Sequence, residues 1–461
     1  MTPVAPLLVP AAAAAEGHAF AASLPIWTVL PFAALLLCIA LLPLAAPRFW
    51  ESNLRKLLVA AACSLPVLAL VLWHVAVRPT GPEALGHLAH AVREYASFIA
   101  LLASLYVIAG GIFLRGDLKA TPAVNTAFLA VGAVLANLVG TTGASMVLIR
   151  PILRTNAERR NVKHIPVFFI FLVSNVGGAL TPIGDPPLFL GYLRGVPFAW
   201  PLLHAWPIWL LGVGVVLVAF FALDTWSYRL ETPAARAVDR VRVEPLGLDG
   251  WGNLLLLGGV VASVLLLSPA EGVHDLREWH LREAAMVALA GVSLAVTPRA
   301  VRARNVFSFG PILEVAALFA GIFVTMLPAT LLLEVHGGEL GLHAPWHFFW
   351  ATGALSSFLD NAPTYVTFAS VACGELGPGV CESATRLGGM AASPEGIPIL
   401  LAVSVGAVFM GANTYIGNGP NFMVRAIAEE AGVRMPSFFG YMVWALVVLF
   451  PVYLLVTAVF F

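Results

Sequence analysis

The sequence predicts an all-α polytopic membrane protein made of two inverted repeats. Of its 461 residues, 60% are hydrophobic and only 11% are charged, and its mean hydropathy is +0.90. A soluble protein of this length would carry far more charge. Several solidly apolar runs reach roughly 20 residues, enough to cross the hydrocarbon core of a bilayer. Similar segments also recur in the same order in the two halves of the chain. We therefore expect about ten transmembrane helices, two re-entrant hairpins and two broken helices.

The expected spans begin after an Ala/Pro-rich tail, residues 1–24, which lacks the basic start of a signal peptide. We read it as a loose tail, with a cleaved leader as the alternative. The first membrane repeat then covers 25–223 and the second covers 251–461. Between them, 224–250 is rich in charge and is expected to be a solvated cytoplasmic linker. The expected spans are 24–46, 57–77, 94–114, 165–192, 205–223, 251–267, 282–296, 311–333, 397–424 and 438–461.

Two further apolar segments, 125–149 and 346–372, have centres rich in Asn, Gly, Ser, Thr or Pro. Such backbone is tolerated at membrane depth only where protein or water surrounds it. We expect both to be re-entrant hairpins that return to the side they entered from; a kinked ordinary span is the alternative. With both hairpins returning, most of the 25 basic residues collect on one side. The positive-inside rule makes that side cytoplasmic and puts both termini outside, in what we expect to be the bacterial inner (plasma) membrane.

The two expected broken helices are related by sequence. Residues 181–187 read Thr-Pro-Ile-Gly-Asp-Pro-Pro, and residues 414–420 read Thr-Tyr-Ile-Gly-Asn-Gly-Pro. Gly and Pro weaken a helix and free backbone carbonyl groups. The hairpin centres correspond as well, with Gly140 aligned to Asp360. An odd number of crossings separates equivalent elements, so the halves are inverted. Inverted repeats with broken helices are typical of alternating-access transporters.

Asp185 and Asp360 are the sharpest functional candidates, because an ionised carboxylate at membrane depth needs a cation, a donor or water. Either could instead cap a broken helix, and the two roles can coexist. If each hairpin tip packs on the break of its own half, each half forms one cation or proton site with one carboxylate. Hydroxyl, amide and carbonyl oxygens suit a small hard cation such as Na⁺. The first site would use Asn137, Thr141, Thr142, Ser145, Asn175, Thr181 and Asp185; the second would use Ser357, Asp360, Asn361, Thr364, Asn413, Thr414 and Asn418.

These motifs resemble the ion-transporter superfamily, which includes NhaD-type sodium/proton antiporters and citrate-transporter-like proteins. The resemblance rests on three motifs: Asn-Val-Gly-Gly at 175–178, Ile-Gly-Asp-Pro-Pro at 183–187 and Phe-Leu-Asp-Asn-Ala-Pro at 358–363. The resemblance implies a homodimer, elevator-like movement of hairpins and broken helices, and sodium at their junctions. The first hairpin departs from the family: it reads Val-Gly-Thr-Thr-Gly at 139–143, without the Ser-Asn-Thr of the dicarboxylate symporters or the acid of some antiporters. Sodium coupling at the first site is the weaker expectation.

The leading hypothesis is a sodium/proton antiporter that binds Na⁺ and H⁺ as transported ions at Asp185 and Asp360, with no cofactor. The alternative is a cation-coupled transporter of citrate or another carboxylate. An intramembrane enzyme is disfavoured, since no zinc signature or nucleophile with a base is visible. The expected partners are small cations, the lipid bilayer and a second copy, and the zero net charge gives no indication of nucleic-acid binding. Cys373 and Cys381 share one polar loop and could form a disulfide if it faces an oxidising space.

Overall fold

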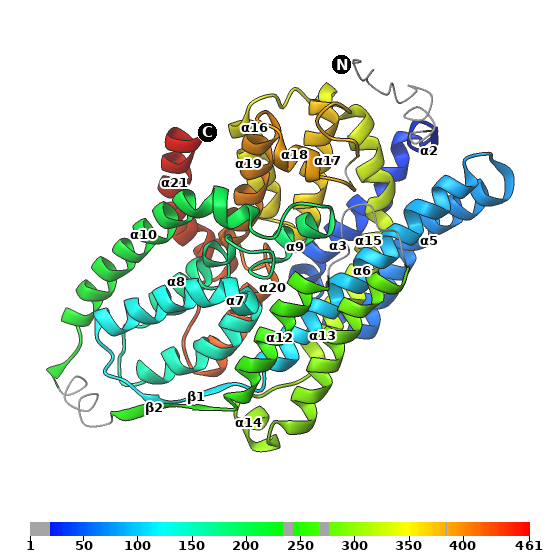
Figure 1. Ribbon diagram of the computed structural model, residues 1–461. Helices are drawn as coiled ribbons and strands as arrows, with labels where there is room; N and C mark the ends of the chain where they lie inside the picture. The colour runs from blue at the N-terminus through cyan, green and yellow to red at the C-terminus, as the bar shows by residue number, and fades with distance from the viewer. Residues whose placement is uncertain (1–18, 234–242, 268–275, 384) are drawn as a thin grey trace, which may run out of the picture.

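The computed structural model describes residues 19–233, 243–267, 276–383 and 385–461, and the described chain is almost entirely helical (Figure 1). Within these residues, eight helices are long and apolar enough to cross a membrane. Each of the ten expected spans falls on a helix or on a pair of helices with a break between them, which confirms the all-α polytopic class. The longer elements are α3 (Leu30–Ala45), α5 (Asn53–Val77), α6 (Gly81–Ala109), α7 (Pro122–Thr155), α10 (Trp200–Arg229), α12 (Gly252–Leu266), α13 (Leu276–Val296), α15 (Gly310–His336), α19 (Gly396–Met410) and α21 (Phe438–Phe460).

The helices pack in two groups, and each group combines equivalent helices from both repeats. One bundle, on the right of Figure 1, contains α3, α5, α6, α12, α13 and α15; the other gathers α7, α10, α19 and α21 with the shorter helices α8, α9, α16, α17 and α20. Small residues allow close approach in the first bundle, where a Cβ on Gly321 of α15 would lie 2.7 Å from the Cβ of Ala60 on α5. The shorter elements are α2 (Ala19–Ala22), α4 (Pro47–Trp50), α8 (His164–Leu172), α9 (Pro186–Leu193), α14 (Arg299–Arg304), α16 (Pro345–Ser356), α17 (Asn361–Leu376), α18 (Gly388–Ala392) and α20 (Gly419–Glu430), with 3₁₀ turns η1 (Ile26–Val29), η2 (Val176–Gly178), η3 (Gly337–Leu340) and η4 (Gly411–Asn413).

Both expected hairpins return to the side they start from. In α7 the helix breaks at Gly140, whose φ of 78° and ψ of 153° are not helical. The two ends of α7 then meet, because Asn125 and Asn156 exchange side-chain hydrogen bonds of 2.9 and 2.7 Å. The second hairpin is α16 followed by α17, and its ends meet where His343 Nδ1 lies 2.7 Å from Glu375 Oε1. A kinked ordinary span is therefore excluded at both places.

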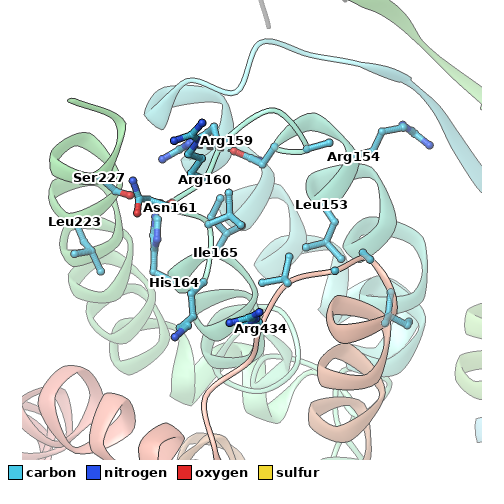
Figure 2. A pocket seen from close by; sticks show the side chains of 18 of the residues that line it. Leu153, Arg154, Arg159, Arg160, Asn161, His164, Ile165, Leu223, Ser227 and Arg434 are labelled. Atoms are coloured by element: carbon cyan, nitrogen blue, oxygen red, sulfur yellow. Dashed lines mark hydrogen bonds between the residues drawn. The ribbon is translucent and has the colours of Figure 1, made fainter. Parts of the chain in front are cut away.

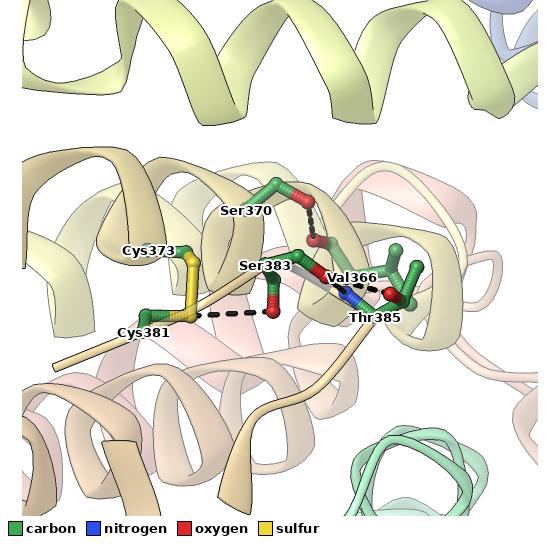
Figure 3. Close-up of a disulfide and its surroundings, with 6 residues drawn as sticks. All are labelled: Val366, Ser370, Cys373, Cys381, Ser383 and Thr385. Atoms are coloured by element: carbon green, nitrogen blue, oxygen red, sulfur yellow. Dashed lines mark hydrogen bonds between the residues drawn. A yellow bond between two sulfur atoms is a disulfide. The ribbon is translucent and has the colours of Figure 1, made fainter. Parts of the chain in front are cut away.

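Both predicted helix breaks are present. The first broken helix is α8, η2 and α9, with an irregular stretch before Pro186; the second is α19, η4 and α20, which resumes at Gly419. A disulfide joins Cys373, within α17, to Cys381 in the loop that follows, which answers a question that the sequence left open (Figure 3). Figure 3 shows the bond joining α17 to the following loop, where Cys381 Sγ lies 3.3 Å from the Ser383 carbonyl oxygen.

The linker and tail predictions were wrong at their edges. The expected solvated linker 224–250 begins inside α10, where Asp224 is fully buried, and ends in strand β2 (Glu244–Asp249). Strand β2 pairs antiparallel with β1 (Phe113–Asp117), a segment partly assigned to the span 94–114. That span instead runs from Gly81 to Ala109 as α6.

Tertiary contacts explain both exceptions. Asp224 is held by the buried side chains of Asn125 and Arg159, and the backbone of β1 finds its hydrogen-bond partners in β2. At the N-terminus, Phe20 is fully buried and its N–H donates to Glu83 Oε2 at 3.0 Å, so 19–24 is packed rather than loose. The predicted tail residues 1–18 and linker residues 234–242 lie outside the described part of the chain.

Candidate functional site

Each hairpin tip is bound to the break of its own half through equivalent bonds. The N–H of Thr141 donates to the Gly184 carbonyl at 2.8 Å, and the N–H of Asn361 donates to the Gly417 carbonyl at 3.2 Å. Thr181 Oγ1 donates to the Asn137 carbonyl at 2.6 Å. Thr414 Oγ1 makes the matching bond to the Ser357 carbonyl. The repeat alignment predicts these pairs, so the expected packing of tip on break within each half is confirmed.

The glycines of the breaks are required because two backbone segments touch there. A Cβ on Gly184 would lie 2.2 Å from the Gly178 carbonyl oxygen, and one on Gly417 would lie 2.5 Å from the Gly411 carbonyl oxygen. Asn137 ties the same region together: its Nδ2 donates to the Gly177 carbonyl at 2.6 Å, and its Oδ1 accepts from Leu180 N at 2.8 Å. The first break is therefore an ordered, hydrogen-bonded structure.

Asp185 lies where all four irregular segments meet. Its side chain is buried, and its Oδ1 accepts from Thr141 Oγ1 at 2.7 Å and from Asn418 Nδ2 at 3.1 Å. Its Oδ2 accepts from Asn361 Nδ2. Thr141 comes from the first hairpin, whereas Asn361 and Asn418 come from the hairpin and break of the other half. The prediction of two separate sites, each drawn from one half, is therefore wrong: one carboxylate gathers donors from both.

A second layer of amides links the halves behind Asp185. Asn418 Nδ2 also donates to Asn175 Oδ1 at 3.2 Å and to the Ser174 carbonyl at 3.0 Å. Asn175 Nδ2 donates to Asn421 Oδ1 at 2.7 Å. Ser145 Oγ lies 2.9 Å from Ser174 Oγ. Asn175 and Ser145 were predicted, and both lie in this layer rather than on Asp185.

Asn421 was missed by the sequence analysis. It is fully buried, and its Nδ2 donates to the carbonyls of Gly411 and Thr414 at 2.9 Å each. The signal that could have found it is an amide three residues after Asn418, on the first turn of an otherwise amphipathic helix.

Asp360 has a different role from Asp185. It is the N-cap of α17, where its Oδ1 accepts from Ala362 N at 3.1 Å, and it is only half-buried. Capping was the alternative kept open for this residue, and the structure confirms it. Thr364 donates to the Asp360 carbonyl at 2.9 Å, which keeps its hydroxyl within the helix.

Two other predicted ligands lie beside the junction. Asn413 donates to Ser357 Oγ at 2.9 Å and accepts from the Tyr453 hydroxyl at 2.9 Å. Thr142 is half-buried, and among the described residues its side chain makes no hydrogen bond to the junction. Among the described residues neither side chain makes a hydrogen bond to Asp185, although both belong to segments that do.

The electrostatics of the junction combine one acid with neutral donors. None of the described basic side chains hydrogen-bonds to Asp185; its side-chain partners are one hydroxyl and two amides. Each partner stands at the start of a helical segment, as Asp185 itself does at the start of α9. Helix N-termini carry positive partial charge. Asn361 Oδ1 is buried and has no hydrogen-bond partner among the described residues, so it is a spare acceptor beside the carboxylate.

Comparison with known proteins agrees with this architecture. A family model described as "putative citrate transport" matches residues 21–461, nearly the whole chain. The chain belongs to this family. It is also 24% identical over 302 residues to an uncharacterized transporter of Mycobacterium bovis and to one of Mycobacterium tuberculosis. Each match covers 62% of this chain and 65% of the relative. The family and the long apolar helices together make this chain a multi-pass integral membrane protein.

Proposed function

We propose that the protein is a secondary active transporter that exchanges Na⁺ for H⁺ at Asp185. The carrying observation is that a buried carboxylate at the centre of the fold has only neutral hydrogen-bond partners. Burying an ionised acid without a positive partner is costly. A proton or a small cation can offset that charge in turn, and competition between the two for one carboxylate is the basis of exchange.

The ligand set around Asp185 supports a small hard cation. Asp185 oxygens, the Thr141 hydroxyl and the unpartnered Asn361 Oδ1 are all hard oxygen donors. Asp360 was predicted as a second sodium ligand; we now assign the exchange to Asp185, with Asp360 fixing the start of α17. The inferred dimer and elevator-like movement stay predictions.

The test is transport in proteoliposomes in which Na⁺, H⁺ and citrate are varied separately. An outward Na⁺ gradient should drive proton uptake, read as acidification by an enclosed pH dye, with no citrate present. Empty liposomes and a K⁺ gradient of equal size are the controls. A sodium gradient that moves no protons while labelled citrate accumulates would reject the exchanger.

A cation-coupled carboxylate transporter is the second candidate. It is favoured by the helical starts that converge on Asp185, since helix N-termini attract anionic groups, and by the description of the family. It predicts net citrate uptake that requires a cation gradient. Sodium-driven proton movement that is unchanged by citrate, with no citrate uptake, would exclude it.

We also propose a bacterial inner-membrane location with both termini outside. The Cys373–Cys381 disulfide lies at the ends of the second hairpin, away from the basic ends of the first, and disulfides persist in oxidising compartments. Labelling a single added cysteine at residue 461 in intact cells with an impermeant thiol reagent tests this orientation. Labelling only after the cells are lysed would place the C-terminus in the cytoplasm and contradict the proposed orientation.

A further inference from the structure

A large pocket lies at the ends of the first hairpin, apart from Asp185 (Figure 2). Its volume is about 1020 Å³. Three stretches line it: 150–165, which joins the end of α7 to α8; the last turns of α10; and 427–444, which joins α20 to α21. Figure 2 shows Leu223 and Ser227 on one wall and Arg434 on another. The pocket therefore touches both halves of the chain at the face predicted to be cytoplasmic.

The lining is strongly basic. Six arginine and lysine side chains and His164 line the pocket, and the one acidic side chain among the described lining residues is Glu430. Such a surplus of positive charge attracts anions. The basic residues are Arg150, Arg154, Arg159, Arg160, Lys163 and Arg434.

Half of these cations are already engaged. Arg154 donates to the carbonyls of Leu114 and Gly116, and Arg159 pairs with the buried Asp224. Arg150 has only a loose contact, 4.0 Å from Glu430.

The other half are available at the rim. The side chains of Arg160, Lys163 and Arg434 are exposed and, within the described residues, make no hydrogen bond or ion pair. Asp224, below the pocket, also accepts from His164 at 2.8 Å. Its negative charge is therefore used by Arg159 and His164, and the positive charge of the rim residues is left uncompensated by any described side chain.

A buried donor in the lining points to a ligand independently. Arg159 has a side chain that is only 3% exposed, yet its Nε has no hydrogen-bond partner among the described residues. Buried N–H groups in folded proteins are almost always satisfied. An oxygen of a bound anion would supply the missing acceptor, and guanidinium groups favour oxyanions such as phosphate.

One wall is apolar and faces outward. Trp226 and Leu230, at the end of α10, are 62% and 58% exposed. Basic residues next to exposed aromatic and aliphatic side chains at a helix end are typical of contacts with lipid headgroups. This wall could lie along acyl chains while the rim holds the headgroup.

We propose that this pocket binds a phosphate-bearing anion, supplied either by an anionic phospholipid headgroup or by a soluble phosphate. Arg160, Lys163 and Arg434 hold the charge, and Arg159 Nε donates from the floor. The bound group ties the return end of the first hairpin to the segment that joins α20 to α21. This site is independent of the exchange proposed at Asp185.

Binding is tested on the full-length protein in detergent by native mass spectrometry with cardiolipin, and by thermal unfolding with inorganic phosphate. The test variant is the triple change Arg160→Ala, Lys163→Ala and Arg434→Ala. Its control, Arg48→Ala, Arg55→Ala and Arg299→Ala, removes the same charge from exposed positions outside the pocket. We expect the test variant to weaken binding by about tenfold or more, because each basic group near an anionic headgroup contributes measurably, and the control to keep wild-type binding.

The two probes separate the sources. Cardiolipin adducts without stabilisation by phosphate identify a lipid site, and stabilisation by phosphate as well identifies a site for the phosphate group itself. Equal cardiolipin and phosphate binding by the two triple variants overturns the proposal, as does the absence of both from the wild type. A thermal unfolding midpoint equal to that of the control variant, measured without added phosphate, reports that the test variant is folded.

Discussion

The two hairpin-and-break units share a backbone arrangement but differ in chemistry. In both, a tip N–H binds the carbonyl of a glycine in the break, and a threonine hydroxyl holds the tip. Yet Asp185 in the first break corresponds to Asn418 in the second, and Gly140 in the first tip corresponds to Asp360 in the second. The first acid is buried among donors, whereas the second is partly buried and caps a helix. The repeat therefore determines how each hairpin tip packs on its helix break. Single substitutions between the repeats determine which of the two junctions holds a buried carboxylate.

Replacing the buried acid should erase this difference between the halves. Asp185→Asn keeps the shape of the side chain but removes the charge that a cation or proton would offset. Sodium-driven proton movement in proteoliposomes should fall to that of empty liposomes. Wild-type exchange in a protein with confirmed Asn at 185 would refute the assignment of the exchange site.

Adding a Cβ atom at the central glycine of either helix break should destabilise the protein to a similar extent. Gly184→Ala and Gly417→Ala each place a Cβ within 2.5 Å of a backbone oxygen, so each should lower the free energy of unfolding by about 3 kcal/mol. Thermal unfolding in detergent measures this loss. Gly214→Ala is the control, because a Cβ there meets nothing within 4 Å; a control as unstable as the break variants would remove the steric explanation.

Removing one donor from each hairpin tests whether both halves serve the same carboxylate. Thr141→Val and Asn361→Ala each take a hydrogen bond from Asp185. A hydrogen bond to a charged group is worth about 1.5–3 kcal/mol. We expect each change to shift the apparent sodium affinity by about tenfold or more, read from the sodium dependence of exchange. A change in sodium affinity for Thr141→Val but not for Asn361→Ala would show that only the first half contributes to the ion site.

The second acid should be far less sensitive. Asparagine caps helices about as well as aspartate, so Asp360→Asn should preserve α17 and reduce exchange by less than about tenfold. Asp360→Ala removes the cap and should cost about 1 kcal/mol of stability. Complete loss of exchange in Asp360→Asn, with unchanged thermal unfolding, would show that both acids handle ions.

The smallest effect is expected at Thr142, next to a ligand but outside the junction. Thr142→Val should leave the sodium affinity within about twofold of wild type, since its hydroxyl makes none of the described bonds there. A shift as large as that of Thr141→Val would show that the tip rotates during transport.

Local sequence signals were enough to predict the breaks, the hairpins and the pairing of each tip with its own break. Glycine, proline and polar residues inside apolar runs have few explanations at membrane depth. The contacts of Asn361 and Asn418 with Asp185 were not predictable, because they join segments 176 and 233 residues apart whose relative placement depends on how the halves pack. The burial of Asp224 was missed because its partners Arg159 and Asn125 lie 65 and 99 residues earlier in the chain, in the first hairpin region.

The three donors of Asp185 have a mechanical consequence. Any motion that pulled the two repeats apart at their centre would detach a carboxylate from Asn361 and Asn418 together. A displacement that carries both tips and both interrupted helices as one block would leave those bonds untouched. If the predicted elevator-like movement takes place, a covalent cross-link between the tips would be compatible with turnover, and the surfaces that move past each other would lie along the long helices of the other bundle.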